Sequence, residues 1–125
     1  MSDGSEHMPA AIDGHDAVAY FTEGRAVRGR AEHVVEHDGK RWLFSSEEHA
    51  RRFEAAPERF APSYGGRCAF ATSLGKSETG DPARWHVRDG RLFLNSNGVA
   101  QLLWKVLPGR VAAADRNWAE RPGDA

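Results

Sequence analysis

Two Asp-Gly dipeptides, each flanked by short runs rich in apolar residues, constrain the fold of this chain most strongly. Asp38-Gly39 separates residues 33–37 from 40–44, and Asp89-Gly90 separates 84–88 from 91–95. Asp-Gly tolerates the positive φ angles of a type I′ turn, which joins two strands through a two-residue loop. The dipeptides lie 51 residues apart. We therefore expect the same hairpin to occur twice.

The two-residue loop predicts which strand residues lie opposite one another in the first hairpin. The expected pairs are His37 with Lys40, Val35 with Trp42, and His33 with Phe44. The face of His33, Val35, Trp42 and Phe44 is the more apolar, so we expect it to be buried and to draw His33 inward. We expect His37, at the turn, to be solvated. In the second hairpin, His86, Phe93 and Asn95 share the face that corresponds to Val35 and Trp42.

A helix is expected after each hairpin. Ser45 and Glu48 fit a capping box, and the first helix ends at Pro57, with Ala50, Phe53 and Ala56 along one face. His49 lies among charged neighbours and is expected to be solvated. The second helix runs from about Asn97 to Pro108 and carries Val99, Leu102, Leu103 and Val106. A third starts at Pro108 and carries Val111, Ala114, Asp115 and Trp118 on one side.

The expected fold class is therefore α+β, with two ββα units packed together. Neither unit can bury its apolar face alone. A glycine-rich connection, residues 61–82, joins the units, and a C-terminal helix follows them. Residues 10–119 are expected to form the domain, with flexible segments at 1–9 and 120–125. His7 falls in the first of these segments and is not a candidate ligand.

Charge and cysteine content narrow the classes of function. The net charge is -1, which gives no electrostatic reason to expect a nucleic-acid partner. No apolar run reaches the roughly 20 residues of a membrane span, and residues 1–8 lack the apolar stretch of a signal peptide, so a cytoplasmic protein is expected. The chain has one cysteine, Cys68, and six histidines. Cys68 has no intrachain disulfide partner, which leaves thiol or metal chemistry for it.

Several segments together resemble the YHS-domain family. They are residues 11–21 (AIDGHDAVAYF), 42–44 (WLF), 60–70 (FAPSYGGRCAF), 75–76 (GK), 80–82 (GDP), 89–95 (DGRLFLN), 114–115 (AD) and 117–118 (NW). The resemblance implies a small α+β module, found alone or attached to metal-transporting ATPases and oxygenases, that binds a metal ion. The chain departs from the family pattern at positions 15, 33 and 37, where histidines replace aromatic residues. It departs again at Val35, where a histidine is usual, and at Arg67 and Phe70, where tyrosines are usual.

The resemblance and the hairpin faces together give a set of candidate metal ligands. Cys68 lies in the most family-like segment, and His33 and His86 lie on corresponding hairpin faces; His15 completes the set. Mixed nitrogen and sulfur ligands suit copper or zinc, and iron is a further candidate. Each ligand also has a structural interpretation, as a small core thiol or a hydrogen-bonded core imidazole. The candidate surrounding residues are Tyr64, Arg67, Trp42, Phe93, Asp13 and Asp16, with either aspartate orienting His15 or capping the following turn.

Three functions stay open on the sequence. The first is a metal carrier, sensor or accessory protein that uses Cys68 and histidines. The second is a small copper- or iron-dependent oxidoreductase, which would need a substrate pocket of roughly 300 Å³ or more beside the ligands. The third is a metal-free interaction module with a protein partner. Whether the chain is an enzyme is left open.

Overall fold

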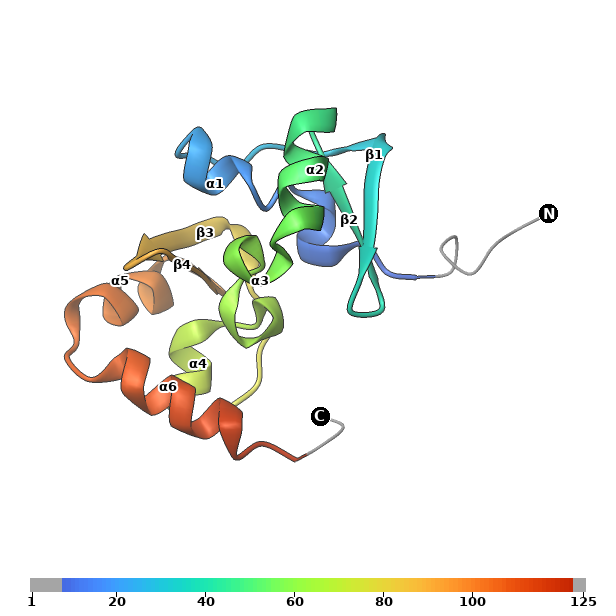
Figure 1. Ribbon diagram of the computed structural model, residues 1–125. Helices are drawn as coiled ribbons and strands as arrows, with labels where there is room; N and C mark the ends of the chain where they lie inside the picture. The colour runs from blue at the N-terminus through green and yellow to red at the C-terminus, as the bar shows by residue number, and fades with distance from the viewer. Residues whose placement is uncertain (1–7, 123–125) are drawn as a thin grey trace. The chain divides into compact units, whose positions relative to one another are not determined.

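The computed structural model describes residues 8–122, in which hairpins and helices follow one another as expected (Figure 1). The elements are η2 (Ala11–Gly14), α1 (Ala19–Thr22), β1 (Arg30–His37), β2 (Lys40–Phe44), α2 (Glu47–Ala55), α3 (Pro57–Phe60), η3 (Ser63–Gly66), α4 (Ala69–Ser73), β3 (Asp81–Arg88), β4 (Arg91–Asn95), α5 (Gly98–Val106) and α6 (Arg110–Ala119). Within the described residues, the chain divides into two compact units, residues 8–61 with 89–91 and residues 62–88 with 92–122. The α+β class is confirmed. That the two units pack together, and that residues 10–119 form one domain, stay predictions.

The first hairpin forms around the expected turn. Asp38 and Gly39 have φ angles of 54° and 74°, as a type I′ turn requires. His37 pairs with Lys40, and Val35 pairs with Trp42. These parts of the register are confirmed.

The expected pair of His33 with Phe44 is wrong, because β1 bulges and Arg30 lies opposite Phe44. Gly29 enters the strand so close to β2 that a Cβ atom there would lie 2.3 Å from the Leu43 carbonyl carbon. His33 is half-buried rather than enclosed.

The core of the first unit lies between α2 and the hairpin, where aromatic rings meet. Phe53 of α2 stacks on Trp42, with ring centroids 4.8 Å apart, and contacts Phe44 at 5.1 Å. Contrary to expectation, His37 is half-buried, with its ring edge-to-face against Phe53 at 5.6 Å. His37 and Val35 point to the same side of the strand, which brings His37 to the edge of this core.

The first long helix begins one residue later than the capping box predicts. Ser46 is the N-cap, and its hydroxyl accepts a hydrogen bond from the backbone N–H of His49 at 3.1 Å. Ser45 does not cap the helix, because its N–H and its hydroxyl both donate to the carboxylate of Asp16.

The second unit repeats these elements, and α5 buries the positions that correspond to the buried positions of α2. Asn97 caps α5 as expected, accepting from the N–H of Ala100 at 2.8 Å. Trp104 is fully buried and Ala100 lies with it on the inner side, whereas the expected apolar face is largely exposed. The exposed side chains are Val99, Leu102 and Val106, at 69%, 59% and 61%. The apolar residues of α5 lie on all sides of the helix, so their periodicity alone does not predict which face is buried.

The glycine-rich connection contains helices rather than a long loop. Within it, α4 packs on α6, and the Asn117 side chain donates to the carbonyls of Thr72 and Ser73 at the end of α4. The C-terminal helix begins at Arg110 rather than Pro108, because Gly109 lies before it in a left-handed conformation with φ 75°.

Candidate functional site

A buried carboxylate, that of Asp16, is the centre of polar contacts in the first unit. Its side chain is fully inaccessible to solvent. Oδ1 accepts from the backbone N–H groups of Val18 and Ala19, at 2.9 and 3.1 Å. Oδ2 accepts from the N–H and the hydroxyl of Ser45, at 2.9 and 2.7 Å, and lies 2.7 Å from Nδ1 of His49. Five hydrogen bonds therefore satisfy a charge that burial would otherwise make costly.

The imidazole of His49 is oriented by this carboxylate. Only 9% of the residue is exposed. A carboxylate accepts hydrogen bonds, so we assign the ring proton to Nδ1, which leaves the lone pair on Nε2. Nε2 faces the hydroxyl of Thr22, with 3.4 Å between the two atoms. Thr22 itself is an exposed residue of α1.

The sequence contains a signal for this pair that the charged neighbours of His49 obscured. His49 lies four residues before Phe53, so both side chains fall on the inner face of α2. The charges point outward, where Arg51 and Glu47 form an exposed ion pair at 2.8 Å. The expectation that His49 is solvated is wrong. The interpretation of Asp16 as a cap is confirmed, and the imidazole it orients is that of His49, not His15.

The two other histidines proposed as ligands in the first unit, His15 and His33, are not hydrogen-bonded to this pair among the described residues. Nδ1 of His15 is 3.2 Å from the carbonyl oxygen of Ile12, within a local turn. His33 lies in the bulged part of β1. The side chain of Asp13 is 77% exposed, and its carboxylate lies 4.0 Å from Arg28. Neither His15 nor His33 has a hydrogen bond to Asp16 or His49 in the described part of the chain.

Cys68 and His86 belong to the second unit. Cys68 is fully buried, with Sγ 3.6 Å from Oδ1 of Asn95, and it packs against Ala71 and Ala100. His86 is half-buried, and its Nδ1 has no hydrogen-bond partner among the described residues. Burial lowers the pKa of His86, and the nearby charges of Arg88 and Lys105 lower it further. Within residues 8–122, no hydrogen bond joins Cys68 to His86.

The remaining candidates take part in packing and local hydrogen bonds. Tyr64 is buried against Phe93 and Trp104, and its hydroxyl donates to Asp115 at 2.8 Å. Trp42 lies in the aromatic core of the first unit, and its indole N–H donates to the His37 carbonyl at 2.9 Å. The Arg67 guanidinium donates to the Ser77 hydroxyl rather than approaching Cys68.

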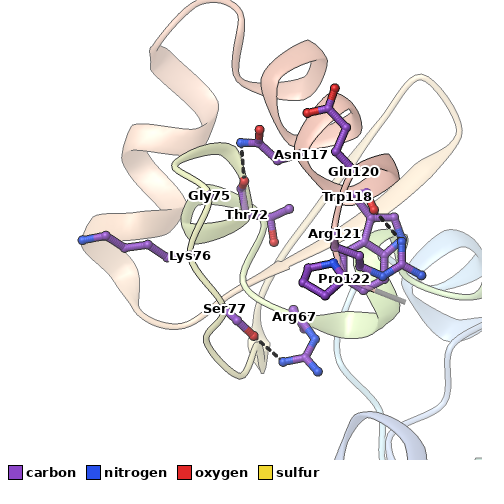
Figure 2. Close-up of a pocket in the computed structure, with 10 residues that line it drawn as sticks. All are labelled: Arg67, Thr72, Gly75, Lys76, Ser77, Asn117, Trp118, Glu120, Arg121 and Pro122. Atoms are coloured by element: carbon purple, nitrogen blue, oxygen red, sulfur yellow. Dashed lines mark hydrogen bonds between the residues drawn. The ribbon is translucent and has the colours of Figure 1, made fainter. Parts of the chain in front are cut away.

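Two pockets lie in the second unit. One, of about 350 Å³, is lined by Cys68 together with Phe70, Ala71, Leu103 and neighbouring residues. The other, of about 330 Å³, lies between the end of α6 and the segment after α4 (Figure 2). No group of three or more His, Cys, Asp or Glu side chains in residues 8–122 is placed to hold a metal ion. Among the described residues, the structure therefore offers one well-oriented imidazole as a metal ligand rather than a complete set of ligands.

These features define a small α+β protein with a buried carboxylate–imidazole pair. Residues 18–64 match the family model of the YHS domain, a family to which metal binding is ascribed. The match contains His33, Trp42, His49 and Tyr64, and it ends before Cys68 and His86. No curated protein and no solved structure matches the chain. None of the described helices has the length and hydrophobicity needed to cross a bilayer.

Proposed function

We propose that the chain binds a transition-metal ion, copper or zinc before iron, as a carrier, sensor or accessory protein. One observation carries the proposal: the 2.7 Å contact between Asp16 and Nδ1 of His49. An imidazole that ligates a metal generally donates its other ring N–H to a carboxylate, which sets its tautomer and makes it a better ligand. In the first unit, His49 would be the ligating imidazole of such a site, and Asp16 would be the carboxylate that orients it.

His49 Nε2 would be the anchoring ligand. Copper and zinc both accept imidazole nitrogen. Thr22 is the neighbour that would yield, since its 3.4 Å contact with Nε2 is long for a hydrogen bond. His33 and His15 stay proposed ligands in the first unit, and Cys68 and His86 stay proposed ligands in the second. With few protein ligands, water would complete the coordination, and such an open site suits exchange of the metal better than a closed structural role.

Metal titration of variants tests this assignment. We expect zinc and copper to bind the wild-type protein, and His49→Gln to weaken binding at least about tenfold through loss of the anchoring ligand. Cys68→Ser and His86→Ala should be titrated in parallel, since each removes one ligand of the set predicted from the sequence. In the wild type, long-range proton–nitrogen NMR would identify the ring nitrogen of His49 that the metal perturbs.

Thr22→Ala is the matched control, because it removes the neighbour of Nε2 and leaves the imidazole in place. It should bind metal at least as well as the wild type. An unperturbed His49 in metal-loaded wild-type protein would contradict the anchoring role, even if His49→Gln failed to fold. Absence of stoichiometric metal after reconstitution would contradict metal binding altogether.

The pocket beside Cys68 favours the oxidoreductase as the second candidate. Its volume of about 350 Å³ is large enough for a small substrate, and Cys68 is enclosed rather than exposed as a carrier thiol would be. A metal-dependent turnover of a small molecule that Cys68→Ser abolishes, while metal binding at His49 persists, would favour this candidate over the carrier.

A further inference from the structure

The 330 Å³ pocket of the second unit has a charge pattern that metal binding does not explain. Its lining contains two guanidinium groups, those of Arg67 and Arg121, and one carboxylate, that of Glu120. In Figure 2 the Glu120 carboxylate points away from Arg67, and the Lys76 ammonium points away from the other lining side chains. The cations that remain at the pocket are therefore the two arginines, although the whole chain has a net charge of -1.

Among residues 8–122, no carboxylate pairs with either arginine. Arg67 donates to the Ser77 hydroxyl, and Arg121 donates to the backbone carbonyl of Trp118. Within the described part of the chain, neither forms an ion pair. A guanidinium has five N–H donors in a planar fork, so most donors of both groups stay available for an oxyanion.

Trp118 of α6 supplies the apolar part of the pocket. Trp118 is half-buried, and the Arg121 guanidinium stacks 3.6 Å from the centroid of its ring. The neighbouring Asn117 joins α6 to the end of α4 through its hydrogen bond to the Thr72 carbonyl at 2.9 Å. This bond, together with backbone N–H groups of residues 74–76, also caps the α4 carbonyls that would otherwise repel an anion.

We propose that this pocket binds a small organic anion. A phosphate or carboxylate group would accept hydrogen bonds from Arg67 and Arg121, and an apolar portion would lie against Trp118 and Pro122. A volume of about 330 Å³ exceeds what a bare oxyanion fills and falls in the range of small-molecule sites. The second unit would then have its own ligand, independent of the metal proposed for the first.

Phenyl phosphate and benzoate are suitable probes, with inorganic phosphate and benzyl alcohol as their polar and apolar halves. Titration followed by proton–nitrogen NMR should give saturable shifts at residues 67, 75–77 and 117–121, with Kd on the order of 1 mM or tighter. Whichever of phenyl phosphate and benzoate binds tighter identifies phosphate or carboxylate as the preferred group. Inorganic phosphate should bind more weakly than phenyl phosphate, and benzyl alcohol should not saturate.

Arginine variants distinguish specific binding of the anion in the pocket from nonspecific electrostatic attraction to a basic surface. Arg67→Gln and Arg121→Gln should each weaken binding about tenfold or more, as expected for loss of a charge-assisted hydrogen bond. Arg116→Gln removes the same charge from an exposed position of α6 outside the pocket and should leave Kd unchanged. Equal weakening by all three variants, saturation by benzyl alcohol, or shifts spread over both units would overturn the proposal. So would the absence of saturable binding by either anion.

Discussion

The two units place a buried side chain at the same point of the same backbone pattern, Asp16 in the first and Cys68 in the second. In each, a four-residue turn containing left-handed residues comes before it, and a short helix follows. The Asp16 N–H donates to the Val27 carbonyl at 2.7 Å, and the Cys68 N–H donates to the Glu78 carbonyl at 2.8 Å. The hairpin strands and the helix after them then repeat with an offset of 51 residues at every boundary.

The difference lies in what each buried side chain contacts. Asp16 bonds to His49, the third residue of α2, whereas Cys68 packs against Ala100, the third residue of α5. The same backbone arrangement therefore encloses a carboxylate–imidazole pair in one unit and a small apolar group with a thiol in the other. The repeated backbone supports a common scaffold, and the chemistry belongs to these two positions rather than to the scaffold.

Truncating the two buried side chains should give the largest contrast between the units. Asp16→Ala leaves five donors around an empty space, so the free energy of unfolding should fall by about 3–5 kcal/mol. Cys68→Ala removes one sulfur atom, with its long 3.6 Å contact to Oδ1 of Asn95, and should cost only about 1 kcal/mol. Urea unfolding of both variants measures the difference. A similar loss in both would mean that the contacts of the Cys68 thiol stabilise the protein as much as those of Asp16, and the contrast would fail.

The sequence predicted the repeated scaffold because its signals are local. Asp38-Gly39 and Asp89-Gly90 specify their turns, and Asn97 caps its helix, within a few residues of chain. The features that the sequence did not predict depend on contacts between residues far apart in the chain. The bulge in β1 reflects the close approach of Gly29 to Leu43, and the burial of His49 depends on Asp16, 33 residues earlier. A single helix pattern does not contain that information.

Two glycines at corresponding places test how closely the scaffolds agree. A Cβ atom at Gly29 would lie 2.3 Å from the Leu43 carbonyl carbon, and one at Gly80 would lie 2.3 Å from the Gly66 carbonyl oxygen. Backbone atoms cannot move aside as a side chain can, so Gly29→Ala and Gly80→Ala should each cost about 1–3 kcal/mol.

Gly98→Ala is the control for these two variants. Its Cβ atom would meet only the flexible Arg84 side chain, at 3.4 Å, and alanine favours the helix by up to about 1 kcal/mol. We expect this variant to be as stable as the wild type or more so in urea unfolding. If only one of Gly29→Ala and Gly80→Ala destabilised the protein, the two strand entries would not be equivalent.

The smallest expected effect concerns His86, whose Nδ1 has no partner in the described residues, in contrast to Nδ1 of His49. Burial, and then the charges of Arg88 and Lys105, lower its pKa in the folded protein below the ordinary 6.5. As the pH falls below about 6.5, the unfolded chain takes up a proton at this histidine before the folded chain does, so its contribution to stability is lost. His86→Gln should reduce the loss of stability on acidification, measured by urea unfolding at a series of pH values. Lys105→Gln removes only the smallest of the three causes that lower the pKa of His86, so it should reduce the loss of stability less than His86→Gln does. A loss of stability that His86→Gln leaves unchanged would show that the imidazole acquires a partner in solution and that the contrast with His49 is incorrect.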